Sequence, residues 1–497
     1  MRNWKSIVVL IAACFAVGSK SFSQATLSPG DRPDLMPLLL AGAVPPPAHD
    51  SAARREFQIG EILITGNKKT KDFIIKRELP FAAGDSVRLD ELVEKFKVGR
   101  QQLVNTRLFN DVVISLKSFR GYTIDIQIDV KERWYIFPIP YFKPVDRNLQ
   151  TWADKGYSLS RINLGAKFTY YNTTGRNDRL RLWLITGYSR ALQLSYDQPF
   201  AFSDKSLKHG YGINFNYNAQ KEVNPMTVGN KQFFLRADSI PHANKFLEEV
   251  NSASLSYSYR PHLRTRHVVR LGFTTVRIDS AVWHANPSYL TVNQKLKSVY
   301  PEISYSVSYI NTDYAPYPLR GKMGDLTVSR MGFGQDLGVW ALTARGSQSW
   351  DLHKKFSYTL QANGTIKLPF DQPYTQHRIF GYGDFYLRGM EKYVVDGVAA
   401  LLVRSTLRRE FANFTIGLPV RSRSHDRIPF RIYGKTYGDA GYSYNKNYPD
   451  NSLVNRMLYT AGAGVDIVTL YDVVMRFEYS FNMLGQQGLF FHFKNDF

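Results

Sequence analysis

Apolar and polar residues alternate one by one through most of the chain beyond residue 134. Ile213, Phe215 and Tyr217 are separated by single asparagines, and Leu255 and Tyr257 by a serine. Successive side chains of a β-strand point to opposite faces, so this alternation predicts strands. The segments run for about 10 to 14 residues, longer than a mean soluble strand and long enough for a tilted strand to cross a bilayer. We therefore predict a mainly β chain in which residues 134–497 form a transmembrane antiparallel β-barrel.

The length of this region sets the expected number of strands. Residues 134–497 number 364, and about 23 residues per strand and connection give about 16 strands, an even number as expected for a bacterial outer-membrane barrel. Between Lys221 and Val250 a long polar excursion is either an extracellular loop or a further hairpin.

The chain ends on a strand-like segment, Gly488–Phe497, with apolar residues on alternate positions and a terminal aromatic. Its apolar positions include Leu489, Phe491, Phe493 and Phe497. The segment resembles the C-terminal strand by which bacterial outer-membrane proteins are recognised by their insertion machinery. An unpaired edge here would leave backbone groups unsatisfied in lipid, so we expect this strand to close the barrel.

Residues 56–133 follow a different pattern, that of a small α+β unit. Strand, helix, helix, strand and strand are predicted at Phe57–Ile64, Phe73–Leu79, Leu89–Leu103, Phe109–Ser115 and Tyr122–Val130. This order, with a turn at Gly66 and Asn67 after the first strand, resembles a POTRA domain; the alternative is an ordinary small α+β domain. The resemblance implies binding of unfolded client chains or partner subunits by strand addition to a sheet edge.

The first 55 residues predict export and a tether. Residues 1–25 have a basic start and a short apolar run, as signal peptides do, and the proline-rich residues 26–55 predict an extended linker. Cys14, the single cysteine, lies inside the apolar run, so the mature chain is expected to contain no thiol. The alternative is that Ile11–Cys14 is a lipoprotein cleavage box and Cys14 is lipidated.

Charge and composition narrow the function. The formal net charge is +22, but the basic residues are scattered and form no block or nucleic-acid motif, so we expect no nucleic-acid partner. The mean hydropathy of −0.30 does not argue against a barrel, because outward and lumenal residues alternate and cancel. The ten histidines show no metal-ligand spacing and no catalytic motif is present, so we expect no metal, no cofactor and no enzyme.

Three segments carry a resemblance to the BamA/TamA and two-partner-secretion superfamily of polypeptide-transporting barrels. They are Gly381–Met390, Tyr437–Tyr442 and Ala461–Asp466. The first looks like the family's Arg-Gly-aromatic loop tip, with Met390 in place of the usual aromatic. The second is similar to the Asp-x-Gly strand that receives this loop, here Asp439 and Gly441. The third is similar to the glycine-rich penultimate hairpin.

A physical hypothesis follows for the loop. A guanidinium inside a barrel is costly unless it is paired, and arginine binds a carboxylate through two parallel hydrogen bonds. We expect Arg388, with Gly389, to pair with Asp439 and pin the loop in the lumen; the alternative is that Arg388 caps an exposed hairpin. Gly381, Gly383 and Gly389 are expected to permit the tight backbone path. Thr406 stands where the family often has a second acidic residue, so a two-carboxylate socket is not implied.

By this resemblance the chain is an outer-membrane protein with its POTRA domain in the periplasm. It implies assembly, insertion or translocation of polypeptides through a seam between the first strand, expected at about Tyr157–Tyr171, and the last strand. The implied partners are outer-membrane lipid, unfolded or partly folded client polypeptides, and periplasmic or lipoprotein accessory subunits. The alternatives are a dedicated secretion pore for one substrate, a passive channel and, more remotely, a lipid-modifying barrel enzyme. One POTRA-like unit is few for a general assembly factor, which favours an accessory or dedicated role.

Overall fold

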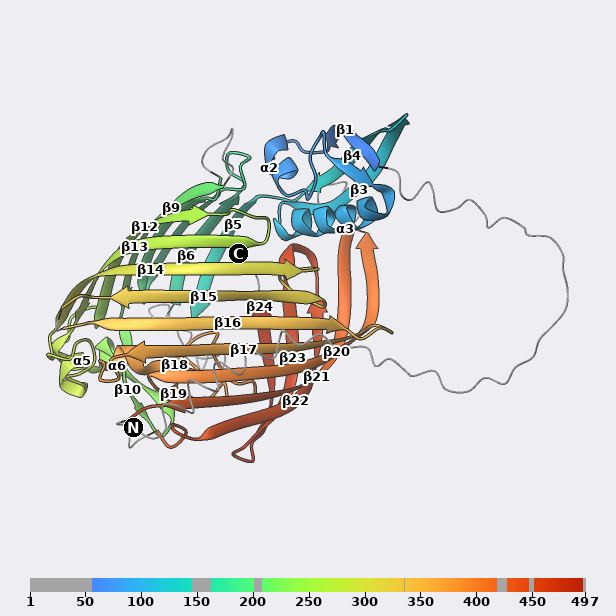
Figure 1. The fold of residues 1–497 in the computed structure, drawn as a ribbon. Coiled ribbons are helices and arrows are strands. Elements are labelled where there is room, and N and C mark those ends of the chain that lie inside the picture. Colours follow the sequence, from blue (N-terminus) through green and yellow to red (C-terminus); the bar gives the residue numbers. More distant parts are fainter. Residues whose placement is uncertain are drawn as a thin grey trace, which may run out of the picture.

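The computed structural model describes residues 56–144, 162–200, 208–334, 336–417, 427–446 and 451–494. It contains a small α+β domain at one end of a large curled sheet (Figure 1). The fold class predicted from the alternation is therefore confirmed. The predicted signal peptide and linker lie outside the described residues, as does Phe497. Among the described residues, no helix is both long enough and apolar enough to cross a membrane.

The small domain is a four-stranded sheet with two helices. Its elements are β1 (Glu56–Thr65), α2 (Asp72–Arg77), β2 (Ser86–Arg88), α3 (Leu89–Asn105), β3 (Phe109–Arg120) and β4 (Thr123–Glu132). The strand order is β2-β1-β4-β3, with β1 and β4 parallel, so that β2 and β3 are the edge strands. The five predicted elements are present, and β2 is an addition. Three residues are too few to show a periodic pattern, which is why the sequence did not reveal it.

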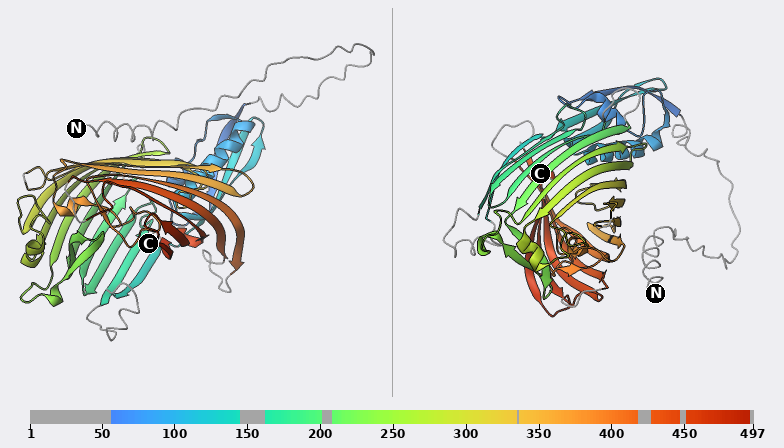
Figure 2. Two further views of the ribbon diagram at one scale, coloured as in Figure 1. Left: turned by 90° about the horizontal axis from the view of Figure 1, so that it is seen from below. Right: turned by 90° about the vertical axis from the view of Figure 1, so that its left-hand side faces the viewer.

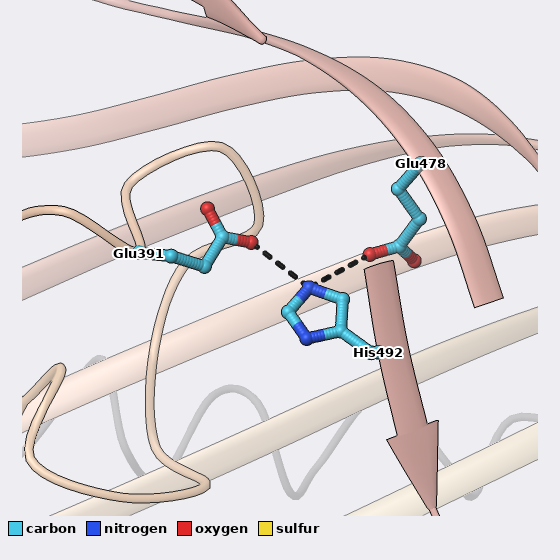
Figure 3. Close-up of side chains that lie close together, drawn as sticks. All are labelled: Glu391, Glu478 and His492. Atoms are coloured by element: carbon cyan, nitrogen blue, oxygen red, sulfur yellow. Dashed lines mark hydrogen bonds and ion pairs between the residues drawn. The ribbon is translucent and has the colours of Figure 1, made fainter. Parts of the chain in front are cut away.

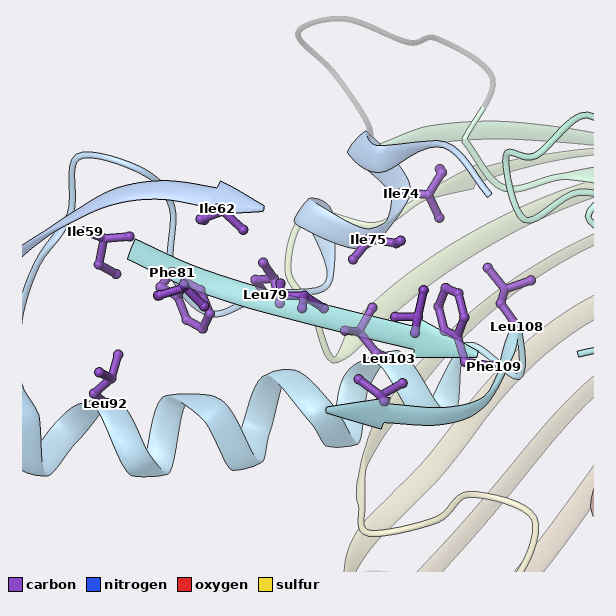
Figure 4. Packing of buried hydrophobic residues seen from close by; sticks show 14 of the residues in the cluster. Ile59, Ile62, Ile74, Ile75, Leu79, Phe81, Leu92, Leu103, Leu108 and Phe109 are labelled. Carbon is purple, nitrogen blue, oxygen red and sulfur yellow. The ribbon is translucent and has the colours of Figure 1, made fainter. Parts of the chain in front are cut away.

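The core of this domain follows from the alternation in β4. Ile124, Ile126 and Ile128 are fully buried against Ile75 of α2 and Leu103 of α3, in one continuous cluster (Figure 4). Burying one such aliphatic side chain contributes about 1.5–3 kcal/mol. The domain therefore has a hydrophobic core, and Phe200 after β8 with Tyr170 and Tyr171 of β6 continues this cluster onto the large sheet.

The large sheet has 16 antiparallel strands in the order β24-β23-β22-β21-β20-β17-β16-β15-β14-β13-β12-β9-β8-β7-β6-β5. From the first edge they are β5 (Ile136–Pro144), β6 (Ile162–Tyr171), β7 (Arg179–Gly187), β8 (Arg190–Gln198), β9 (His209–Gln220), β12 (Glu248–Tyr259), β13 (Thr265–Ile278), β14 (Lys297–Thr312), β15 (Gly321–Met331), β16 (Val339–Asp351), β17 (Phe356–Leu368), β20 (Ala399–Gly417), β21 (Arg427–Tyr444), β22 (Met457–Val468), β23 (Val474–Asn482) and β24 (Gln487–Lys494). The sheet curls round, and its first strands return towards its last ones (Figure 2).

Short elements lie between these strands. They are β10 (Glu222–Val228), β11 (Lys231–Arg236), η3 (Ala237–Ser239), α5 (Ser280–Ala285), α6 (Tyr374–His377), β18 (Arg378–Phe380), β19 (Val395–Asp396) and η4 (Leu470–Asp472). The polar excursion after Lys221 contains the hairpin β10-β11, which forms a two-stranded sheet outside the large one. The excursion thus contains a hairpin, but this hairpin lies in a connection and adds no strand to the barrel.

One prediction about the barrel was wrong. The first strand is β5, not the segment about Tyr157–Tyr171, most of which is the second strand β6. The reason is the sequence of β5, which contains Pro138 and Pro140. Proline inside a run argues against a strand in general, but an edge strand tolerates it where the missing N–H faces away from the ladder.

The alternating positions separate an apolar outer face from an inner face. Leu255 and Leu271 on β12 and β13 are 59% and 55% exposed, and Ile303 on β14 and Tyr459 on β22 are 41% and 60% exposed. Large apolar side chains recur in this way on most strands of the sheet. Exposed apolar area on this scale is unusual for a protein surrounded by water.

The small domain is docked onto the turns at one end of the sheet. Glu78, after α2, is buried and accepts two hydrogen bonds from Arg260, the longer of them 2.7 Å. Asn105 of α3 donates to the carbonyl of Thr312 at 2.9 Å. Lys71 donates its backbone N–H to the carbonyl of Gly175 at 3.0 Å. Contacts with several separate turns hold the domain in one orientation relative to the barrel.

Candidate functional site

The segment between β18 and β20 packs against the inner face of the last strands. Leu387 and Met390 of this segment are buried with Leu402 of β20 and Leu458 of β22 in one apolar cluster. Met390, which replaces the family's aromatic residue, is therefore part of the packing. We call residues 381–397 the lumen loop.

Arg388 is the centre of the loop's polar contacts. Its backbone N–H donates to Oδ2 of Asp439 at 3.0 Å, and its Nε donates to the same oxygen at 3.0 Å. A further N–H of the guanidinium donates to Oδ1. The Asp439 side chain is fully buried and that of Arg388 is 9% exposed. The structure thus brings together the two residues that the sequence predicted to pair.

Three other residues complete the surroundings of the guanidinium. Thr406 accepts a hydrogen bond from Arg388 at 3.2 Å. The guanidinium therefore meets a hydroxyl at the position where the family often has a second acidic residue. The ring of Tyr437 lies 4.0 Å from the guanidinium carbon, in a cation–π arrangement. Arg404 contributes a second cation, with its Nε 3.7 Å from Asp439 Oδ2. Two arginines therefore share one buried carboxylate.

Two glycines of the loop are required by the backbone. Gly389 has a φ of +89°, and a Cβ there would lie 2.6 Å from Cβ of Ser480. Gly381 has a φ of +83°. Gly383 differs from the prediction, because a Cβ there would meet no atom within 4 Å. Gly441 lies across from the loop, where a Cβ would approach Leu387 to 3.1 Å.

A second buried charge cluster, which the sequence did not predict, lies beside the first. Lys435 of β21 donates to Asp466 of β22 and to Glu478 of β23, each at 2.5 Å, and all three side chains are 1–2% exposed. The sequence does show each of these three charged residues at a position of an alternating strand that faces inward. Such residues are also common on the polar faces of soluble sheets, so the pattern did not single out these three.

The lumen loop also contacts the two last strands. Asn482, at the end of β23, donates to the carbonyl of Gly389 at 2.9 Å. The ring of Tyr386 stacks on His492 of β24, with 5.3 Å between ring centres. The loop is therefore fixed to strands β20 to β24, and it also contacts the β10–β11 hairpin, where Tyr382 lies 2.8 Å from the hydroxyl of Thr227 and Val394 donates its backbone N–H to Asn230.

The two edges of the large sheet are β5 and β24. Among the described residues no backbone ladder joins them. They approach through the η4 turn, where the ring of Tyr471 lies 5.4 Å from that of Phe137, the second residue of β5. On β24 the side chains of Leu489, Phe491 and Phe493 are 73%, 55% and 54% exposed and belong to the outer face.

An ion pair anchors the entry to β5. Arg133 donates to Asp472 in the η4 turn at 2.9 and 3.2 Å. Burial alone would raise the pKa of Asp472, but the charge of Arg133 and hydrogen bonds from Arg133 and Tyr314 outweigh it and lower this pKa below its usual range. The carboxylate therefore stays ionised and holds the junction between the two domains.

The predicted turn after β1 is a tight one. Gly66 has a φ of +86°, and a Cβ there would lie 2.0 Å from the carbonyl oxygen of Val130. Asn67 donates its side-chain amide to the carbonyl of Thr70 at 2.9 Å. The turn thus directs the chain from β1 into α2.

Comparison with known proteins bears on both domains. Residues 57–133 match the family model POTRA, described as "surface antigen variable number repeat". No curated protein sequence matches the chain significantly.

The similar solved structures include three that each match over 88% of the chain. CdiB from Escherichia coli is 13% identical with a TM-score of 0.50, and 75% of its chain is covered. CdiB from Acinetobacter baumannii is 13% identical with a TM-score of 0.48, and 73% of its chain is covered. BamA from Haemophilus ducreyi lacking POTRA domains 1–3 is 17% identical with a TM-score of 0.47, and 84% of its chain is covered. At such identities the likeness concerns the fold. The chain combines a segment that matches the POTRA family model with a 16-stranded antiparallel sheet, and it shares this fold with CdiB.

Proposed function

We propose that this protein resides in an outer membrane and inserts or translocates client polypeptides through a seam between β5 and β24. The exposed apolar side chains on most barrel strands support a lipid-facing surface, as in barrels whose outer face is an apolar band. The POTRA match and the fold shared with CdiB support a role in handling polypeptides.

The observation that carries the proposal is the backbone edge of β5. Residues of an antiparallel strand alternately direct their N–H and C=O groups to one neighbour and to the other. Tyr135, just before β5, accepts a hydrogen bond from Tyr171 at 2.8 Å, and the register continues without a bulge to the end of β5. Odd-numbered residues of β5 therefore bond to β6, and even-numbered residues face the seam.

Pro138 and Pro140 both fall on the seam side. Neither has an N–H, so two consecutive donor positions on this edge are missing. A complete hydrogen-bonded ladder between β5 and β24 is consequently impossible at these positions. A seam that lacks donors is weaker than the other ladders of the barrel, and its opening exposes the edge of β24 to an incoming strand.

The POTRA domain supplies a second edge at which a client can pair. β3 is the outer strand of its sheet and has 12 residues. Leu116 and Phe119 on this strand are 38% and 54% exposed. In this proposal an extended client segment pairs with β3 by strand addition and then passes to the seam, while the pair Arg388–Asp439 locks the lumen loop to β21.

Deletion of the gene followed by outer-membrane proteomics tests the function. Broad loss of barrel proteins supports assembly, and loss of one surface or secreted protein supports dedicated secretion. An unchanged proteome contradicts the proposal and favours a passive channel.

A seam lock tests the mechanism in the same strain. Cysteine pairs scanned between residues 136–142 of β5 and 489–493 of β24 will form a disulfide where the edges meet. We expect function to be lost on oxidation and restored by a reducing agent. The matched control is the cysteine pair at Tyr479 and Leu489, which lie directly opposite each other in the β23–β24 ladder. A locked seam that retains function would contradict lateral opening.

A further inference from the structure

Three potential ligand atoms converge where the lumen loop meets the last two strands. Nε2 of His492 on β24 lies 3.2 Å from Oε1 of Glu391 in the loop and 3.4 Å from Oε2 of Glu478 on β23 (Figure 3). The three ligand atoms all lie within 4.8 Å of one another. The three residues belong to separate segments of the chain, so their spacing in the sequence does not indicate a metal site.

The other polar atoms of these side chains are each held by a separate partner. The backbone N–H of Gly389 donates to Oε2 of Glu391 at 2.8 Å, and Lys435 donates to Oε1 of Glu478 at 2.5 Å. The hydroxyl of Tyr386 lies 3.4 Å from Nδ1 of His492. Partners of this kind orient the ligands of metal sites.

One atom of the cluster is left without a hydrogen bond. Oε2 of Glu478 is buried and has no hydrogen-bond partner among the described residues, and its side chain is only 2% exposed. A buried carboxylate oxygen is costly unless a donor or a cation satisfies it. This oxygen faces Nε2 of His492 (Figure 3), whereas Lys435 donates to the other carboxylate oxygen, Oε1.

The distances suit a particular ion. Zinc binds histidine nitrogen and carboxylate oxygen at about 2.0–2.2 Å in tetrahedral geometry, which places neighbouring ligand atoms about 3.3 Å apart. The two distances from His492 Nε2, 3.2 and 3.4 Å, match this edge. We propose that Glu391, Glu478 and His492 bind one Zn²⁺ ion, with water in the fourth position.

The site would join three segments of the chain. Glu391 belongs to the lumen loop, whereas Glu478 and His492 belong to neighbouring strands at the closing edge of the barrel. A bound ion therefore crosslinks the loop to β24, the strand that borders the seam. Lys435 shares Glu478 with the ion, so the ion binds through the oxygen that Lys435 leaves free.

Metal binding to the purified full-length protein tests the proposal and requires no client. The protein in detergent is dialysed against Zn²⁺ and its metal content is measured by mass spectrometry; Co²⁺, which gives visible absorption bands in tetrahedral sites, reports the geometry. We expect one ion per chain, a tetrahedral Co²⁺ spectrum and a melting temperature raised by Zn²⁺.

Two substitutions and one control locate the ion. His492→Asn and Glu391→Gln should each abolish the bound equivalent; Glu391→Gln lies in the loop and leaves every strand unchanged. The control is His267→Asn, a barrel histidine that contacts Tyr305 on β14, and it should bind as the parent does. Absence of binding in the parent protein, binding that survives Glu391→Gln, or stoichiometric Ca²⁺ in place of Zn²⁺ would each overturn the assignment.

Discussion

The two edges of the barrel sheet differ in how they are held. Behind β24, strands β20 to β23 present buried charges to one another and to the lumen loop: Arg388 and Arg404 share Asp439, and Lys435 lies between Asp466 and Glu478. β5, at the other edge, bonds on one side to β6 and approaches the last strands through the η4 turn. One wall of the barrel is therefore fixed by many specific interactions, whereas no backbone ladder joins it to β5 within the part of the chain that the structure describes. The comparison indicates that opening is confined to one line of the barrel.

The largest effect should come from removing the shared carboxylate. Asp439→Ala leaves Arg388 and Arg404 buried without their counter-ion, and breaking a buried pair in this way costs about 3–5 kcal/mol. We expect a large fall in the temperature at which the barrel loses its compact electrophoretic mobility. Arg388→Ala should cost less, because Arg404 still faces the carboxylate. Equal stability of the parent and Asp439→Ala proteins would contradict the view that the strands behind β24 are held more firmly than β5.

The next effect concerns the junction before β5. Asp472→Asn removes the negative charge facing Arg133 and should cost about 1–3 kcal/mol at neutral pH. Because the folded-state pKa of Asp472 is lowered, its contribution is present above the unfolded value of about 3.9 and is lost as the pH falls below it. The protection of residues 132–136 against hydrogen exchange, taken relative to the intrinsic rate at the same pH, should therefore fall in the parent protein only below about pH 4, and it should be low at all pH values in the variant. A parent protein that already exchanges freely at pH 7 would contradict this.

A smaller effect should follow from restoring donors to the seam. Pro138→Ala together with Pro140→Ala returns two N–H groups to the open edge, each able to contribute about 0.5–1.5 kcal/mol to a ladder. We expect slower hydrogen exchange in β24 and reduced client handling. Pro301→Ala on β14, inside the sheet, is the control and should leave seam exchange unchanged. Faster hydrogen exchange in β24 of the double variant would contradict the assignment of the even-numbered residues of β5 to the seam.

The smallest effect is expected on the wall next to the seam. Arg179 and Asp197 on β7 and β8 are 3.5 Å apart, and their side chains are 36% and 41% exposed. An ion pair so open to solvent contributes about 0–1 kcal/mol. Arg179→Ala should therefore hardly change thermal stability, in contrast to Asp439→Ala. A loss as large as that of Asp439→Ala would show that both walls are equally fixed.

Sequence patterns anticipated much of this architecture. Alternation and segment length predicted the strands, and the helical and extended runs of residues 56–133 predicted the POTRA elements. The motif around Arg388 and the one around Asp439 predicted their proximity, because a buried guanidinium needs a carboxylate. These inferences depend on local periodicity or on one strongly constrained pair.

Other features could not be read in this way. β5 was missed because its prolines oppose strand formation everywhere except on an edge, and the edge is a property of the folded sheet. Glu391, Glu478 and His492 lie on three segments whose proximity depends on the path of the lumen loop. Lys435 and its two acidic partners could not be predicted for a similar reason. The alternation shows which face of a strand a residue lies on, but it does not identify the residues beside it on neighbouring strands.

The prolines of β5 have a consequence for the protein's behaviour towards its own copies. An exposed strand edge is a template on which a second molecule can pair and begin aggregation. Two β5 edges paired so that their prolines lie opposite each other would bring carbonyl oxygens of residues 138 and 140 together with no N–H between them. β5 therefore discourages self-pairing, yet still accepts hydrogen bonds from a foreign strand that has its own donors.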